Sequence, residues 1–378
     1  MKSKQLIFDN RPPQIDSEVH NAFLEGAQWE LDYRLGRISE EKYQHRISKC
    51  LIQVSQLLEL PTPNGLIITS SIEEAVNTAI KGFILVSDVK NIVNLVGDPQ
   101  MFYSARHWAE SMGITSSVVP LLPDGDLDWE YLNSLLSNEK QLVALGISTP
   151  EVHFARQVDR LFERVNRFKS NIVMDITKAM YLGIGCDKQR MASFTIDLMQ
   201  FGAPAGTAIC WLNPLHNWTP LIGGGIQQSG FRGGELSPAL LLSALKSLQN
   251  SSQSVKKRLL HFSELHKNAK ISVKQYIPEA TIVSSDKYLP LGITIMLPDV
   301  EGEAIVLLSK HKGLLISSSS NCYTMIGKPS PVLIAMGFSK EVISGSIHLT
   351  YRDEHSVSDV ETAIRILNDV YRQLRKIS

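Results

Sequence analysis

Thiols are the first side chains in this sequence that could do chemistry. Four occur in 378 residues, and their spacing forms neither a Cys-x-x-Cys metal pair nor a disulfide framework: Cys50, Cys186, Cys210 and Cys322. Thiol chemistry would therefore use one cysteine at a time. Cys322 is the best candidate, because it follows the serine-rich run 317–321, and a flexible, exposed loop suits a nucleophilic thiolate. The alternative is a free surface cysteine without a function.

A carboxylate and an amine lie three residues apart elsewhere in the chain. Asp175 directly follows the apolar run 172–174, which is typical of a buried strand, and Lys178 comes shortly after it. On the residues alone, Asp175 is equally well explained as the cap of the next turn. No His-Glu-x-x-His, paired-histidine or Cys-x-x-Cys spacing predicts a metal site. The glycines 223–225 lack the strand and helix context of a dinucleotide-binding loop.

The pattern of apolar residues predicts the elements that position these side chains. Short continuous apolar runs occur at 66–68, 92–96, 142–147 and 172–174, and helical periods such as 73–83 and 158–168 separate them. Parallel strands covered by helices on both faces have this pattern, so we expect an α/β fold.

The pattern of apolar residues changes after the glycine-rich loop 223–234. A long helical stretch, 237–275, is followed by alternating runs at 293–296 and 346–350, and a final helix begins at a capping-box-like sequence, 356–359. We therefore predict a large α/β domain over residues 1–245, including an N-terminal segment, and a small α+β domain over residues 246–378.

The composition excludes some functions. The 38 Lys and Arg residues balance the 38 Asp and Glu residues, so nucleic acid is not an expected partner. No apolar run approaches the roughly 18 residues that span a bilayer, and we expect a cytoplasmic protein without a membrane partner.

Several strings, in this order and at these spacings, resemble the cysteine desulfurases of the class V aminotransferase family. These are fold type I enzymes that depend on pyridoxal phosphate (PLP). The resemblance extends from residues 6–10 to the final helix and is most specific over 220–235. It implies a PLP-transferase-like large domain with a mostly parallel central sheet, a smaller C-terminal domain, and a homodimer in which the neighbouring subunit closes the site. It also implies that Asp175 pairs with the pyridine nitrogen and that Cys322 carries a persulfide.

The sequence departs from the family where the cofactor is held covalently. Gln200 stands in the place of the Schiff-base lysine, and an amide cannot form an imine. Acids also stand where the resemblance implies phosphate-binding groups: Glu73, Asp197 and Glu235. A carboxylate about 4 Å from a phosphate charge costs roughly 4 kcal/mol at an effective dielectric near 20. Three such acids would repel a dianion unless they were protonated or bridged by a cation.

Two further replacements concern cations. Lys178 replaces a glutamine that contacts the phenolic oxygen of the cofactor, so it could either form the imine from another direction or neutralise the new carboxylates. His348 replaces the arginine that binds the substrate carboxylate and could bind an anion only when protonated.

These replacements lead us to expect a cysteine desulfurase-like pseudoenzyme that has lost PLP-dependent catalysis and needs no cofactor. It would act in sulfur transfer as a partner, regulator or persulfide carrier through Cys322, together with another desulfurase or a sulfur-acceptor protein. One alternative is an active PLP-dependent desulfurase or lyase-type enzyme that uses Lys178. Another is an acid-lined cavity that binds a cation or a basic ligand.

Overall fold

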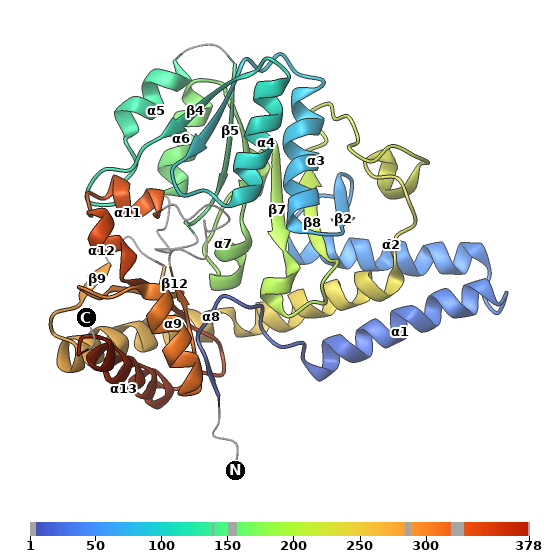
Figure 1. Cartoon of the computed structure of the whole chain (residues 1–378). Coiled ribbons are helices and arrows are strands. Elements are labelled where there is room, and N and C mark those ends of the chain that lie inside the picture. The colour runs from blue at the N-terminus through green and yellow to red at the C-terminus, as the bar shows by residue number, and fades with distance from the viewer. Residues whose placement is uncertain (1–4, 138–139, 150–156, 284–288, 319–328, 377–378) are drawn as a thin grey trace.

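The computed structural model describes residues 5–137, 140–149, 157–283, 289–318 and 329–376. In these residues a large sheet with flanking helices forms one part of the molecule, and a smaller sheet packs beside it with the C-terminal helix (Figure 1). Within the described ranges, no helix is both long and apolar enough to cross a membrane.

The large sheet has seven strands in the order β2-β8-β7-β6-β5-β3-β4. Their bounds are β2 (Leu66–Thr69), β3 (Asn91–Leu95), β4 (Thr115–Val119), β5 (Gln141–Gly146), β6 (Asn171–Asp175), β7 (Ser193–Asp197) and β8 (Ala208–Leu212). All neighbouring pairs are parallel except those that β8 forms with β2 and β7. The predicted α/β fold with a mostly parallel central sheet is therefore confirmed.

Helices cover both faces of this sheet. Successive strand residues point to opposite faces, so Ile67 and Ile92 pack against one helical layer and Leu66 and Val93 against the other. The first layer contains α3 (Ile72–Ile84) and α4 (Gln100–Ser111), and the second contains α2 (Glu40–Leu57), α5 (Trp129–Leu136), α6 (Val158–Arg167), α7 (Thr177–Leu182) and part of α8 (Pro238–Tyr276). Burial on both faces explains the continuous apolar runs in the sequence.

The N-terminal helices form a projecting pair. Helix α1 (Ser17–Arg34) and α2 lie side by side and extend away from the large sheet (Figure 1). Helix α1 also packs along α8, and a Cβ atom added to Gly26 would collide with the carbonyl oxygen of Pro238. The absence of a side chain at Gly26 thus permits the close approach of these two helices.

The smaller sheet is antiparallel, in the order β12-β13-β10-β9. Its strands are β9 (Thr281–Val283), β10 (Gly292–Met296), β12 (Ser317–Ser318) and β13 (Ser346–Thr350), and a separate pair joins β1 (Leu6–Ile7) to β11 (Leu314–Leu315). The helices of this part are α9 (Gly302–His311), α11 (Pro331–Ala335), α12 (Lys340–Ser344) and α13 (Val357–Leu374). The capping box predicted for the final helix is present, formed by Ser356 and Asp359.

Helix α8 links the two parts of the molecule. Its first half packs in the core of the large sheet, and its second half packs in the core that α13 and the small sheet share. The predicted boundary at residue 245 falls inside this helix, and the division into domains 1–245 and 246–378 stays a prediction.

Candidate active site

Two acids lie at the carboxyl edge of the large sheet. Asp175 ends β6 and Asp197 ends the neighbouring parallel strand β7. Thr177 connects them, because its hydroxyl donates to Asp175 Oδ1 and accepts from the backbone N–H of Asp197 at 2.8 Å. The open edge beyond parallel strands is the usual place for a binding site in α/β proteins.

Lys178 lies in the first turn of α7, directly beside this pair. Its Nζ donates a hydrogen bond to the amide oxygen Oε1 of Gln200, which belongs to the short 3-10 helix 198–201 after β7. Removal from water lowers the pKa of Lys178, and the carboxylates of Asp175 and Asp197 oppose this shift. The amine therefore contacts the side chain of residue 200, the position that the resemblance assigns to the Schiff-base lysine, although it comes from another element.

Asp175 has an environment that favours its protonated form. Desolvation raises its pKa to about 6, even though the hydroxyl and the backbone N–H of Thr177 stabilise the carboxylate. The backbone N–H of Thr177 donates to Asp175 Oδ1 at 3.0 Å, so the turn-capping interaction is also present. A carboxyl group so shifted at the end of a strand is a candidate functional group.

The two acids predicted near the phosphate differ in exposure. Glu73 is exposed in the first turn of α3, whereas Asp197 is half-buried. Desolvation raises the pKa of Asp197, and the charge of Glu73 raises it further. The donors of the turn before α3 bind an acid of the same chain segment. The backbone N–H and the hydroxyl of Ser70 both donate to Glu74 Oε2, at 2.7 and 2.5 Å.

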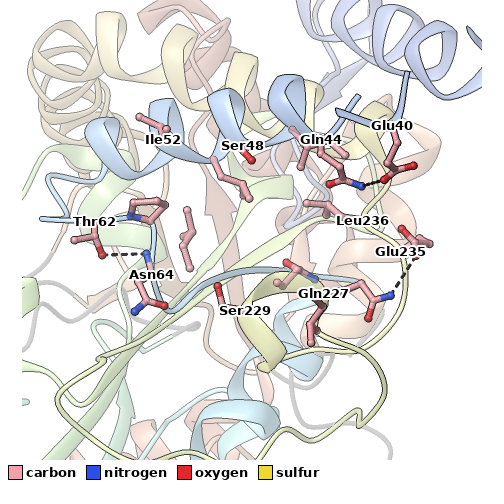
Figure 2. A pocket seen from close by; sticks show the side chains of 16 residues that line it. Glu40, Gln44, Ser48, Ile52, Thr62, Asn64, Gln227, Ser229, Glu235 and Leu236 are labelled. Carbon is pink, nitrogen blue, oxygen red and sulfur yellow. Dashed lines mark hydrogen bonds between the residues drawn. The ribbon is translucent and has the colours of Figure 1, made fainter. Parts of the chain in front are cut away.

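Glu235 is not part of this group within one chain. It is exposed on the loop that precedes α8, where Gln227 Nε2 donates to Glu235 Oε1 at 3.2 Å. Figure 2 shows Glu235 at a different cavity, of about 760 Å³, opposite Glu40 and Gln44 of α2. The described residues contain no cluster of three or more histidine, cysteine or acidic side chains that could hold a metal ion.

The loop in this cavity is attached to the edge of the large sheet. Gln228 has a positive φ of 45°, and its side-chain amide bonds both backbone groups of Ile68 in the edge strand β2, at 2.7 and 3.2 Å. The predicted irregular loop is thus anchored by a side chain that imitates strand pairing.

Cys322 lies outside the described residues. Burial raises the pKa of Cys50 and Cys186, and it raises that of Cys210 to about 12. A raised pKa disfavours the reactive thiolate. Among the described cysteines, none is therefore a good nucleophile.

The anion-binding role predicted for His348 requires a protonated ring, and its surroundings in the structure disfavour that form. His348 is 2% exposed in β13, and its Nδ1 shares a hydrogen bond of 2.8 Å with the hydroxyl of Thr294. Desolvation lowers its pKa to about 4, so the ring is neutral at pH 7. Sequence reasoning missed Arg11 and Arg352, which line a cavity together with Lys178. A cation shortly after each of two strand-like segments is a weak signal, and only the fold brings these two together.

The comparisons with known proteins agree with this architecture. No family model matches the chain. It is 26% identical over 322 residues to the cysteine desulfurase IscS of Rickettsia typhi, covering 83% of this chain and 77% of that protein. It is 27% identical over 346 residues to the mitosomal cysteine desulfurase of Encephalitozoon cuniculi, covering 88% and 78%.

Solved structures show the same fold. A NifS-like protein matches with a TM-score of 0.85 at 17% identity, covering 98% of this chain and 99% of the other. The apo cysteine desulfurase of Thermococcus onnurineus matches with a TM-score of 0.82 at 14% identity, covering 98% and 95%. The fold and the sheet-edge site thus define a protein of the class V aminotransferase fold. The chain is a cysteine desulfurase-like protein, homologous to the IscS and NifS-like members of that class.

The expectation that the chain needs no cofactor is wrong. The homologues found are cysteine desulfurases, which are PLP-dependent. The residues at the sheet edge fit this cofactor, because Asp175 supplies a carboxyl group at a strand end and Lys178 supplies a desolvated amine. Desolvation raises the pKa of Asp197, so its surroundings disfavour the charged form of this side chain. When bound, the cofactor would supply an electron sink, with Asp175 at its ring nitrogen.

Proposed function

We propose that this chain is a PLP-binding sulfur-transfer protein of the cysteine desulfurase type. In this proposal Lys178, and not the residue at position 200, supplies the amine that holds the cofactor. The observation that supports this most is the hydrogen bond from Lys178 Nζ to the side chain of Gln200. The two side chains meet, so an amine is available beside the position where the family's lysine would start.

The state of this amine supports the same proposal. An amine attacks an aldehyde only in its neutral form, and desolvation lowers the pKa of Lys178. Gln200 accepts the hydrogen bond without carrying a charge, so it orients Nζ while adding no full negative charge that would favour the ammonium form. Asp175 and Asp197 limit the shift, and protonation of either acid would lower the pKa of Lys178 further.

Chemical trapping tests the proposal. The purified chain is titrated with PLP, reduced with borohydride and digested, and the modified peptide is identified by mass spectrometry. We expect a pyridoxyl group on Lys178, and no such adduct in Lys178→Arg, which keeps the charge but cannot form the imine. A matched control is Gln200→Lys, in which the adduct should be shared with residue 200. An adduct found only on other lysines of the wild-type chain would refute the role of Lys178.

A second candidate function is sulfur transfer without catalysis by the chain itself. Glu73 and Asp197 favour it, because the resemblance assigns both positions to phosphate-binding groups, and carboxylates there would repel the phosphate of a cofactor. In this function Cys322 receives a persulfide from another desulfurase and passes it to an acceptor protein. Labelled sulfur should move from a loaded donor to the wild-type chain and to Cys186→Ser, but not to Cys322→Ser. Transfer that persists in Cys322→Ser would exclude the carrier role.

We also propose that the chain forms a homodimer through the face shown in Figure 2. The cavity of about 760 Å³ is open, and the loop beside it exposes apolar side chains, with Ile226 92% exposed and Leu221 and Ile222 each 40% exposed. Such a patch suits a second copy. Light scattering after gel filtration should show a dimer that Ile226→Asp dissociates, whereas Leu260→Asp, on exposed α8 surface, should not. A monomeric wild-type chain would contradict the assembly.

A further inference from the structure

Helix α8 has two faces of opposite character along its second half. One face packs into the core that α13 and the small sheet share, and it carries Phe262, Leu265, Ala269 and Val273. The opposite face is exposed to solvent, and five of its side chains lie along one line of the helix because they recur three, four or seven residues apart. These five residues, which we call the basic stripe, are Lys256, Leu260, Lys267, Ile271 and Lys274.

Two apolar side chains separate the lysines of the basic stripe. Leu260 is 75% exposed and Ile271 is 52% exposed. A single exposed apolar residue is common on protein surfaces. Here both lie between lysines of the same helix face, so one partner that covered the stripe would bury both. From residue 256 to residue 274 the stripe extends about 27 Å, the length of a helix of ordinary size.

The second half of α8 has a positive charge. Five lysines occur between residues 256 and 274, because Lys257 and Lys270 flank the stripe, and the only acid in that part of the helix is Glu264. The ion pairs that α8 forms with other described residues use different cations, Lys246 and Arg258. The lysines of the stripe therefore keep their charge for a partner.

The acids of the elements packed against this half of α8 already have cations of their own. These pairs are Asp353 with Arg258, Glu354 with Arg352, Glu361 with Arg365, and Glu279 with Arg372. On α13, Asp359 caps the helix start and Asp369 is exposed. Even if Asp369 is counted with Glu264, five lysines stand against two carboxylates, so the surface around the stripe is basic.

An acidic helix of another protein fits this surface better than a membrane or a nucleic acid does. Insertion into a lipid surface requires a wide apolar face, and the apolar face of α8 is buried in the core. A nucleic acid backbone would bind the lysines through its phosphates but would leave Leu260 and Ile271 without contacts. A helix with acids beside a row of apolar residues matches both the lysines and the two apolar side chains.

We propose that the basic stripe of α8 is a docking surface for another protein that presents an acidic, partly apolar helix. Opposite charges steer the two surfaces together, and burial of Leu260 and Ile271 between them slows dissociation. The stripe contains neither Lys178 nor any residue of the cavity in Figure 2. It is therefore independent of the proposed cofactor chemistry and of the proposed homodimer.

Binding of defined probes to the purified full-length chain tests this surface. The first probe is a fluorescein-labelled synthetic helical peptide of about 20 residues, long enough to span the stripe, with glutamates on both sides of a row of leucines. The second is the same peptide with glutamine in place of every glutamate. By fluorescence anisotropy we expect saturable binding of the acidic peptide alone, and the affinity should fall as salt is added, because ions screen the charges.

Variants place the binding on α8. Lys256→Glu/Lys267→Glu reverses two charges of the stripe and should weaken binding of the acidic peptide about tenfold or more. Leu260→Ala should weaken it less, since this change removes contact area and no charge. The matched control is Lys310→Glu/Lys312→Glu, which makes the same change of net charge at exposed positions at the end of α9 and should leave the affinity nearly unchanged.

Other results would overturn the proposal. Absence of saturable binding, or equal binding of the glutamine peptide, would refute a surface that recognises acids. Equal weakening in the α8 and α9 variants would assign the effect to net charge alone. Phosphatidylserine vesicles or duplex DNA that bind without the peptide, and that the α8 variant no longer binds, would assign the stripe to another class of partner. Circular dichroism checks the fold of each variant, and Lys256→Gln/Lys267→Gln replaces the charge-reversal variant if that one is unfolded.

Discussion

Two buried cations on neighbouring elements have very different surroundings. Arg258 of α8 donates to both carboxylate oxygens of Asp353 at 2.8 to 3.0 Å, to the carbonyl oxygen of Tyr181 at 2.8 Å and to Ser251 Oγ at 3.0 Å. Its guanidinium also lies 4.0 Å from the centre of the Tyr181 ring. Lys178, three residues before Tyr181 on α7, donates to the neutral amide of Gln200.

The difference separates a structural cation from a reactive one. Arg258 has a partner for most of its donors, so its charge is compensated and it fixes α7 against α8. Lys178 is desolvated with incomplete compensation, which lowers its pKa and favours the neutral amine. The fixed neighbour thus holds the helix that carries the reactive group, and variants at each place should have opposite consequences.

The largest effect should come from Arg258→Ala. The variant loses the pair with Asp353, leaves the Tyr181 carbonyl without its donor and removes the packing on the Tyr181 ring. We expect the free energy of unfolding to fall by about 3 kcal/mol. Urea unfolding followed by circular dichroism measures this change.

Arg365→Ala is the matched control for this variant. Arg365 pairs with Glu361 one turn away at 2.7 Å and also lies over a tyrosine ring, but both side chains of the pair are exposed. The free energy of unfolding should change far less than in Arg258→Ala, because solvent screens this exposed pair. Equal losses in the two variants would show that burial at Arg258 has no special role.

An effect that reaches a similar size only at the upper end of the pH range should follow from Asp175→Asn. In the wild-type chain desolvation raises the pKa of Asp175 to about 6, so folding favours the protonated acid and stability falls as the pH rises from about 4 to 6. The amide keeps the acceptor for Thr177 but does not ionise. Relative to the wild type, the variant should gain stability between pH 4 and pH 7, by up to about 3 kcal/mol.

Urea midpoints of both chains across this pH range measure the gain. Asp369→Asn, at an exposed position of α13, is the comparison variant. A stability difference that is independent of pH at position 175 would mean that the carboxylate is fully compensated, as the charge of Arg258 is.

Much of the fold was predictable from the sequence because burial on both sheet faces leaves continuous apolar runs. Strand β6 follows that rule. Strand β7 was not identified, since Ser193 and Thr195 are fully buried polar residues that interrupt its apolar pattern. Local pattern does not reveal a polar side chain buried by neighbours from distant segments.

The candidate site was predictable only in part. Asp175 and Lys178 follow one strand and Gln200 follows the neighbouring parallel strand, and the structure brings Lys178 into contact with Gln200, since consecutive parallel strands end at one edge. It could not place Glu235, which lies at another cavity in the single chain, or the cavity of Arg11 and Arg352, whose residues are more than 300 positions apart. These arrangements depend on tertiary packing, as do all the pKa shifts.

The smallest expected effect concerns His348, the third buried basic group. Desolvation lowers its pKa to about 4, so the ring should stay neutral from pH 8 to pH 5. Lys178 differs, because nearby carboxylates oppose the lowering of its pKa. Because the unfolded chain binds this proton more readily, His348 should reduce stability only as the pH falls from about 6.5 towards 4. Imidazole carbon shifts of His348 in nuclear magnetic resonance spectra should be constant from pH 8 to pH 5, with exposed His20 as the internal reference. A titration within that interval would mean that β13 stabilises the imidazolium, and His348 would again be a candidate for anion binding.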